Sequence, residues 1–319
     1  MAAARRLIWV WQRLLYLLPV AVLATFFVFG LLYLVPGDPA VTLAGENASP
    51  QHIEEIRTLY RLDRPVVVQY ADWLTRVAHG DLSRSLLSGE PVSVSIARRL
   101  PNTLLIVAGA LALSVLLGVP LSILAAMKPG GAADQAAMAV ASLGVSVPSF
   151  WLAMILVSLF ALGLHWFPAT GAVPLGENVH AALTHAVLPA LALSASGIAT
   201  VARQLRSGLV EALTSPYVRA LRARGLSRHA ILWKHCLKNV SVPLLTVLGL
   251  LANRLLGAAV VIEAVFAIPG LGSMVTEAAI AKDFPVVQGV VLVVVTVVIV
   301  VNLTVDALCR LLDPRVVPR

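Results

Sequence analysis

The chain has 319 residues, of which 59% are hydrophobic and only 13% are charged. So few charged side chains cannot keep the surface of a soluble protein of this size hydrated, and the composition predicts an all-α protein that spans a membrane. The formal charge of +8 does not indicate nucleic-acid binding, because the basic residues flank apolar runs and no soluble domain presents them. Membrane lipid and membrane topology account for the charge.

Six apolar runs have about the 20 residues that a helix needs to cross a bilayer. Four of them carry no acidic or basic residue, namely 14–37, 102–127, 137–164 and 284–305. The other two, 183–202 and 240–266, are interrupted by His185 and by Arg254 and Glu263. We therefore predict a polytopic protein with six transmembrane helices.

The first run is followed by a long polar segment, residues 36–101. A turn cluster at 36–39 ends the span, Ser49-Pro50 suits the start of a helix, and an amphipathic stretch from Val66 to Val77 carries Tyr70 and Trp73. This segment has too little core to fold alone, so we expect a small folded lid resting on the membrane domain. The prediction is an N-terminus with the first span at 1–35, an extracytoplasmic lid at 36–101, and a five-helix core at 102–319 with a cytoplasmic loop at 208–241.

Four prolines lie inside the first four predicted helices: Pro19, Pro120, Pro148 and Pro189. A proline inside a helix removes a backbone hydrogen bond and kinks the helix, which suits a protein that opens and closes. The alternative is that proline is simply common in transmembrane helices.

Basic residues predict the orientation. With the N-terminus inside, the outer loop 164–183 has no Lys or Arg and 267–284 has only Lys282. The loop between the fourth and fifth runs is strongly basic, so we place it and both termini in the cytoplasm. Its basic residues are Arg203, Arg206, Arg219, Arg222, Arg224, Arg228, Lys234 and Lys238.

The same loop has the pattern of two helices around a glycine. A helix from about Ser215 to Arg224 would end at Gly225, which readily adopts the left-handed cap conformation. Ser227 can then cap a second helix running to about Lys238. Such a loop predicts a docking surface for a cytoplasmic partner, with a basic patch resting on lipid headgroups as the alternative.

The fifth span contains three polar residues that are candidates for a translocation pathway: Arg254, Asn253 and Glu263. Arg254 lies about 16 Å along the helix from Pro243, near the middle of the membrane, where a charge marks a pathway or a pairing partner. Glu263 lies about 180° around the helix, so we do not expect the two to pair and place Glu263 at the outer mouth. A structural pair at a subunit interface is the alternative for Arg254.

Several kinds of chemistry are missing from the sequence. It contains no GxxxxGK[ST] loop for ATP and no HExxH or CxxC spacing for a metal, so we expect neither a cofactor nor a catalytic site. An intramembrane enzyme would need a facing nucleophile and base, and we identify none. Besides an intramembrane enzyme, the second alternative function for a polytopic protein of this kind is a channel or a secondary transporter.

Residues 217–226, YVRALRARGL, resemble the signature of the inner-membrane permeases of ABC importers, in the dipeptide, oligopeptide and nickel branch. Other similar motifs follow along the chain, and the long segment 36–101 indicates the B-type subunit. They are PGDPA at 36–40, RLPNT at 99–103, VPSFW at 147–151, LPA at 188–190, EAVF at 263–266, PGLG at 269–272, DFPVV at 283–287 and DPR at 313–315. Leu221 and Lys238 depart from the signature, which has alanine and proline there.

The resemblance implies a type I ABC importer permease fold in the bacterial inner membrane. It implies as partners a second permease, two ATP-binding subunits that hold ATP and Mg, and an extracytoplasmic solute-binding protein. The substrate would be a dipeptide or oligopeptide, with nickel complexes and glutathione-like peptides as alternatives. The residues implied to contact an ATPase are Tyr217, Arg219, Ala220, Arg222, Ala223, Arg224 and Gly225.

Overall fold

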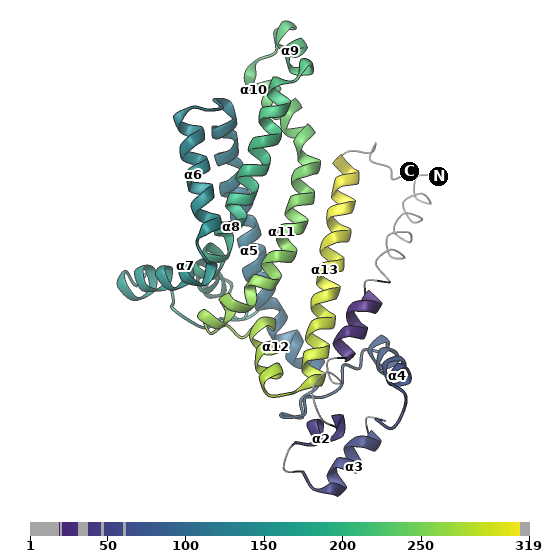
Figure 1. The fold of residues 1–319 in the computed structure, drawn as a ribbon. Helices are drawn as coiled ribbons and strands as arrows, with labels where there is room; N and C mark the ends of the chain where they lie inside the picture. Colours follow the sequence, from purple (N-terminus) through teal and green to yellow (C-terminus); the bar gives the residue numbers. More distant parts are fainter. Residues whose placement is uncertain (1–18, 20, 31–37, 46–47, 60–61, 313–319) are drawn as a thin grey trace. The chain divides into compact units, whose positions relative to one another are not determined.

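The computed structural model describes residues 19, 21–30, 38–45, 48–59 and 62–312. In these residues the chain forms helices, and its only β-type pairing is an isolated bridge between Arg84 and Pro91 (Figure 1). A short apolar helix, Ala21–Gly30, comes first. The later elements are α2 (Pro39–Ala44), α3 (Pro50–Leu59), α4 (Val66–Ala78), α5 (Val92–Met127), α6 (Ala132–Ser146), α7 (Ser149–Leu156), the π-helical η1 (Val157–Gly163), α8 (Val179–Thr214), α9 (Pro216–Ala223), α10 (Arg228–Ala230), the π-helical η2 (Ile231–Cys236), α11 (Leu237–Val265), α12 (Leu271–Ile280) and α13 (Phe284–Leu312).

Four helical stretches are long and apolar enough to cross a membrane: α5, α8, the continuous stretch Arg228–Val265, and α13. A bent pair, α6 with α7 and η1, makes a fifth if it counts as one span. The first of the six predicted spans, 14–37, lies largely outside the described residues. The prediction of an all-helical protein with several membrane spans is confirmed, with four to five candidate spans in the described part.

The span predicted over 137–164, with a kink at Pro148, is a sharply bent pair of helices. The helix stops at Ser146, and the next begins at Ser149 with a bend of 99° between them. Pro148 causes the break, because it has no N–H to donate and forces the preceding Val147 into the extended conformation (φ −85°, ψ 121°). Pro120 and Pro189, by contrast, lie inside α5 and α8 as predicted.

Two helices are longer than the spans predicted for them. α5 and α8 each have 36 residues, which is about 54 Å at 1.5 Å per residue and well beyond a hydrocarbon core of about 30 Å. α5 begins at Val92, so the last ten residues of the predicted lid segment 36–101 form its first turns. The division into 1–35, 36–101 and 102–319 stays a prediction.

The chain clusters into two compact units. The first comprises Met1–Leu100 and Gly270–Ile299, and the second comprises Pro101–Pro269 and Val300–Arg319. In the first unit, the start of α5 packs with α12 and the start of α13 through a buried apolar cluster that includes Val92, Ile96, Leu271 and Val290. Gly289 is needed there, because a Cβ would lie 2.6 Å from Val92 Cγ1.

The segment around α2 and α3 is held by charged side chains of the first unit. Asp38 caps α2 by accepting from the Ala40 N–H at 2.9 Å, and it also binds the guanidinium of Arg57 on α3. These two hydrogen bonds hold the pKa of the Asp38 carboxyl below its ordinary value. The turn before α5 is anchored by Asp283, which accepts from Ser85 Oγ at 2.5 Å and from the Leu86 N–H at 3.2 Å.

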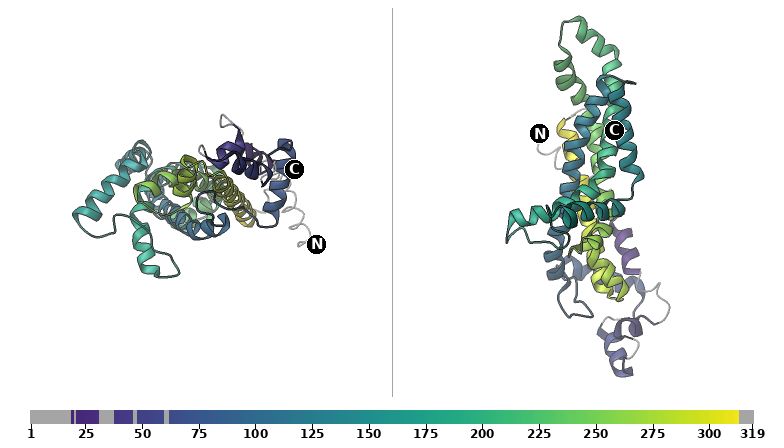
Figure 2. Two further views of the ribbon diagram at one scale, coloured as in Figure 1. Left: turned by 90° about the horizontal axis from the view of Figure 1, so that it is seen from below. Right: turned by 90° about the vertical axis from the view of Figure 1, so that its left-hand side faces the viewer.

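In the second unit, α8 is the central helix and packs against α6, α7 and α11 (Figure 2). Small residues allow the close approach. A Cβ on Gly197 of α8 would lie 2.1 Å from Ser114 Oγ of α5, and one on Gly144 of α6 would lie 2.7 Å from the carbonyl oxygen of Ala195. This is the packing expected between helices in lipid, where close backbone contact replaces the hydrophobic effect.

Candidate coupling site

The loop between α8 and α11 folds as the sequence predicts at its start. Ser215 caps α9, with its hydroxyl accepting from the Val218 N–H at 3.3 Å, and Pro216 occupies the first helical position. The helix ends as predicted at Gly225, whose φ of 82° is left-handed. The N–H of Leu226 then bonds to the carbonyl of Leu221 at 3.2 Å, closing the C-terminal cap.

A helix of eight residues is marginal alone, so its stability must come from packing. Val218 and Leu221 provide it, with 1% and 7% of their surfaces exposed. They join an apolar cluster formed by the ends of α5 and α8 and the start of the helix after the loop. The buried residues of this cluster are Ala126, Leu205, Leu209, Val218, Leu221, Ile231, Leu232, Cys236 and Val240. The departure from the signature at Leu221 is therefore an anchoring side chain.

The opposite side of α9 is open. All seven residues predicted to contact an ATPase are exposed, which are Tyr217, Arg219, Ala220, Arg222, Ala223, Arg224 and Gly225. Arg219 and Arg222 lie three residues apart, so they share a helix face. Figure 1 shows α9 at the tip of the second unit, beyond the end of α8. This geometry presents a cationic surface on a firmly anchored helix and suits an acidic partner.

The second helix of the loop begins as predicted but does not end near Lys238. Ser227 caps it by accepting from the Ala230 N–H at 3.2 Å, and the helix then runs without a break from Arg228 to Val265. Residues 231–236 are π-helical, and Pro243 is accommodated inside α11. The second helix of the loop and the fifth predicted span are thus one continuous helix.

Two contacts at this site were not predicted. The Tyr217 hydroxyl lies 2.9 Å from His235 Nδ1, which joins α9 to the following helix. Arg206 of α8 binds both carboxylate oxygens of Asp134 at the start of α6, and Asp134 also accepts from the Gly130 N–H at 2.8 Å. Asp134 is 3% exposed. The only sequence signals for the pair of Arg206 and Asp134 were that Asp134 is an isolated acidic residue before an apolar run and that Arg206 belongs to a strongly basic segment.

The three candidate pathway residues have different surroundings. Arg254 is exposed on the surface of this chain, midway along α11. Asn253 donates from Nδ2 to Asn302 Oδ1 at 3.1 Å, which links α11 to α13. Glu263 is fully buried and accepts a hydrogen bond of 2.6 Å from Thr103 of α5. Because its carboxylate is enclosed in this structure, Glu263 holds α5 and α11 together, and its role in a pathway stays a prediction.

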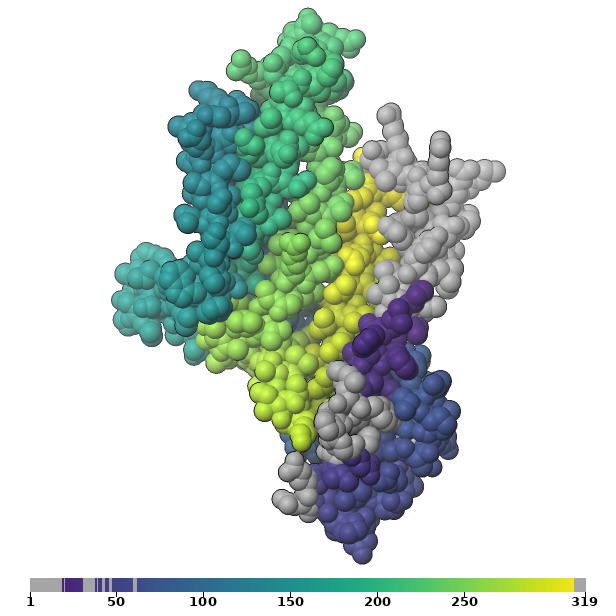
Figure 3. Space-filling model, viewed as in Figure 1, coloured from purple at the N-terminus to yellow at the C-terminus, as the bar shows by residue number. Residues whose placement is uncertain are grey.

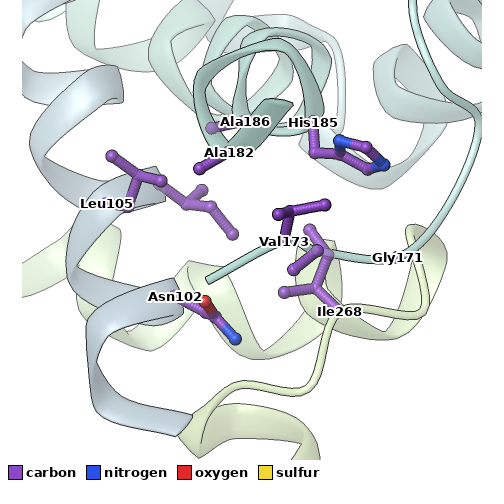
Figure 4. A pocket seen from close by; sticks show the side chains of 10 residues that line it. Asn102, Leu105, Gly171, Val173, Ala182, His185, Ala186 and Ile268 are labelled. Carbon is purple, nitrogen blue, oxygen red and sulfur yellow. The ribbon is translucent and has the colours of Figure 1, made fainter. Parts of the chain in front are cut away.

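A small hollow lies between α5, α8 and the loop after η1 (Figure 4). Asn102 and His185 are its polar members, but the Asn102 amide is already donated to the carbonyl of Pro269, and His185 Nδ1 lies 2.8 Å from the carbonyl of Ala181. The cavity volume of the hollow is about 10 Å³, far below the roughly 300–1,000 Å³ of small-molecule sites. In the described part of the chain no three His, Cys, Asp or Glu side chains gather as a metal site would require.

Comparison with known families accounts for nearly the whole chain. Residues 118–318 match the family described as the inner membrane component of binding-protein-dependent transport systems, and residues 6–107 match the N-terminal region of such components. The chain belongs to this permease family. The predictions of an inner-membrane, multi-pass transport subunit and of the permease family are thereby confirmed.

Relatives match over their full length. The permease is 36% identical to the dipeptide transport system permease DppB of Alkalihalophilus pseudofirmus, with 96% of this chain and 98% of that protein covered. It is 32% identical to the oligopeptide permease AppB of Bacillus subtilis (96% and 98%) and 36% identical to the glutathione permease GsiC of Salmonella choleraesuis (97% and 98%).

A solved structure supports the fold. The MetNI methionine ABC transporter, in an inward-facing conformation, contains a chain that matches 68% of this permease and is itself covered to 96%, with a TM-score of 0.55 and 19% identity. The permease therefore has an ABC importer permease-like fold.

Proposed function

We propose that this permease forms half of the translocation pathway of an ATP-driven importer for dipeptides and oligopeptides. The observation that carries the proposal is α9, whose basic face is exposed while Val218 and Leu221 fix it to the membrane helices. The dipeptide and oligopeptide relatives support the cargo class. The chain makes and breaks no bonds of its own.

The proposed complex has four kinds of partner. A second permease completes the pathway, two ATP-binding subunits hold ATP and Mg, an extracytoplasmic solute-binding protein delivers the peptide, and membrane lipid surrounds the assembly. The exposed residues 217, 219, 220 and 222–225 meet one ATP-binding subunit, with Arg219 and Arg222 facing acidic side chains. No nucleic acid takes part.

The anchoring of α9 explains how its movement reaches the membrane helices. Val218 and Leu221 pack against residues of α8 and of the helix Arg228–Val265. Because that helix is continuous from the loop into the fifth span, a displacement of α9 moves the span with it. Arg206 and Asp134 carry the same movement from α8 to the start of α6. Alternating access then follows from rearrangement of these packed helices.

The exposed side of α11 is the proposed pathway surface. Thr246, Leu250, Arg254, Gly257 and Val261 are exposed at spacings of three and four residues, which places them in one stripe. Arg254 is the single charge in this stripe, at mid-membrane depth. Its guanidinium receives the carboxylate of a passing peptide or one from the second permease. Asn253 lies beside it and orients α11 through Asn302.

The proposed topology places both termini in the cytoplasm, on the side of α9, because the basic residues concentrate there. Segment 36–101 is then extracytoplasmic and core 102–319 carries the loop 208–241 inside. The alternative cargo is a glutathione-like peptide, favoured by the GsiC relative; nickel complexes have no specific observation in their favour.

The test is transport by the purified complex in proteoliposomes. We expect uptake of labelled dipeptides and oligopeptides only when ATP, the ATP-binding subunits and the solute-binding protein are present. Uptake by this chain alone without ATP would identify a channel or secondary transporter instead. Uptake of glutathione but not of dipeptides would show that the proposed cargo is wrong, and the ATP-driven mechanism would still stand.

A further inference from the structure

Within the first unit, α4 packs directly on the apolar helix Ala21–Gly30 (Figures 1 and 3). The ring of Tyr70 lies 5.3 Å from that of Phe26 and 5.7 Å from that of Phe29, and the ring of Trp73 lies 5.9 Å from that of Phe29. Trp73 is 4% exposed. α4 is therefore attached to the helix through an aromatic cluster.

The polar atoms at this contact are satisfied by each other. The Tyr70 hydroxyl donates to the carbonyl of Val22 at 3.2 Å and lies 2.8 Å from Thr25 Oγ1. Thr25 is 5% exposed and falls halfway along the apolar run 14–37. The Tyr70 side chain thus contacts the apolar helix at residues that lie inside the first predicted span.

A second face of α4 is apolar and uncovered. Val67, Ala71, Leu74 and Ala78 follow each other at spacings of four, three and four residues, which places them in one stripe. Val67 is 69% exposed and Leu74 36% exposed. The stripe is turned by about 100° from the Tyr70 and Trp73 face, at 3.6 residues per turn. In the other direction around the helix, Thr75 and Asp72 lie about 70° and 130° from the stripe, with Val68, 40% exposed, between them.

The neighbouring helix also has an uncovered apolar surface. Leu23 and Phe27, four residues apart on Ala21–Gly30, are 61% and 71% exposed. An amphipathic helix that packs beside a predicted span and leaves an apolar stripe exposed has the character of an interfacial helix.

We propose that α4 lies in the membrane interface and that acyl chains of membrane lipid cover the stripe of Val67, Ala71, Leu74 and Ala78. Part of the segment expected to be a water-exposed lid is then an in-plane membrane helix, with Asp72 and Thr75 toward the headgroups. This proposal rests on the proposed topology in one respect, which is that α4 then lies in the outer leaflet of the membrane.

The test uses nitroxide labels on single cysteines in the full chain, assembled with its partner subunits in proteoliposomes. The background is Cys236→Ala with Cys309→Ala. Labels replace Val67 and Leu74 on the stripe, Thr75 on the polar side as the matched control, and Phe27 as the lipid reference. Collision rates with oxygen, which enters lipid, and with a water-soluble nickel chelate are measured at each position.

We expect a high ratio of oxygen to nickel accessibility at 67 and 74, close to that at 27, and a low ratio at 75. Nickel accessibility at 67 equal to that at 75 would show a water-exposed face and overturn the proposal. Poor accessibility to both reagents at 67, with an immobilised label, would show a protein partner there and also overturn it. Should the label at 74 prevent assembly, position 67 alone decides. Peptide uptake is measured in a separate experiment, so a failure of the proposed transport function can be told apart from a failure of the proposed lipid contact of α4.

Discussion

Arg206 binds both carboxylate oxygens of Asp134, and this pair ties the start of α6 to α8 shortly before the chain enters α9. Asp134 has 4% of its side chain exposed and Arg206 has 27%. A carboxylate this enclosed needs its partner, because an unsatisfied buried polar group costs about 1–3 kcal/mol. The pair therefore couples two helices that pack along their length.

Arg206→Ala is expected to lower the free energy of unfolding by about 1–3 kcal/mol, because Asp134 keeps only the Gly130 N–H. The matched control is Arg203→Ala, which removes an exposed arginine from the same helix. Thermal unfolding of the purified complex measures both. A double variant with Asp134→Asn should be less destabilised than the sum of the single variants. Additive effects would contradict direct pairing.

Arg222→Glu is expected to abolish the stimulation of ATP hydrolysis by peptide-loaded binding protein, because it reverses the charge on the exposed face of α9. Folding should be unaffected, since Val218 and Leu221 hold the helix from the other side. Lys238→Glu is the control, as it reverses an exposed charge of the same loop outside α9. Wild-type stimulation in the Arg222 variant would refute the coupling role of this face.

Arg254→Ala is expected to raise the KM for peptides with a free C-terminal carboxylate about tenfold or more. The reason is the loss of one charge-assisted hydrogen bond of about 1.5–3 kcal/mol. Amidated peptides are the matched control substrates and should lose much less, and Arg254→Lys should retain most of the discrimination. An equal loss for both kinds of peptide would instead indicate that Arg254 pairs with a carboxylate of the second permease.

The segment held by Asp38 is expected to loosen in acid. The pKa of Asp38 lies below its ordinary value of 3.8 because the Ala40 N–H and Arg57 stabilise the ionised form. A lowered pKa in the folded state adds stability above pH 3.8, and this is lost as the pH falls through the folded pKa. Because both side chains are about one third exposed, solvent screening keeps this contribution small.

Limited proteolysis by pepsin, across pH 2 to 5, measures this effect. Cleavage around α2 and α3 should rise as the pH falls below about 4. In Asp38→Asn it should be faster at pH 5 and depend less on pH than in wild type. The same steep rise in the variant would assign the acid sensitivity to another group, with Glu90 the next candidate because Ser95 and Arg98 also lower its pKa.

Local signals in the sequence predicted the features that depend on local chemistry. Ser215, Gly225 and Ser227 were predicted as caps because each acts on backbone groups within a few residues. The long apolar helices were predicted for the same reason, since the hydropathy of each is a property of one contiguous stretch of sequence. The all-helical membrane fold and the position of α9 between two long apolar helices followed from these signals.

Features that depend on distant residues were not predicted. Tyr217 and His235 are 18 residues apart and Arg206 and Asp134 are 72 apart, so neither pairing has a sequence pattern. The break at Pro148 was expected as a kink, because hydropathy is continuous through it and does not report the angle between helices. The exposed apolar stripe of α4 was not predicted, because the sequence does not tell which of the two apolar faces of this helix is buried.

The π-helical turn at residues 231–236 determines how the helix is rotated on either side of it. A π-turn arises where one residue is added to an α-helix, and one residue corresponds to about 100° of rotation. Converting this turn to α-helix with all its residues retained would turn Arg254 by about that angle away from its present direction, whereas deleting one residue there would keep that direction. The turn therefore sets the angular register between the exposed basic face of α9 and the middle of α11.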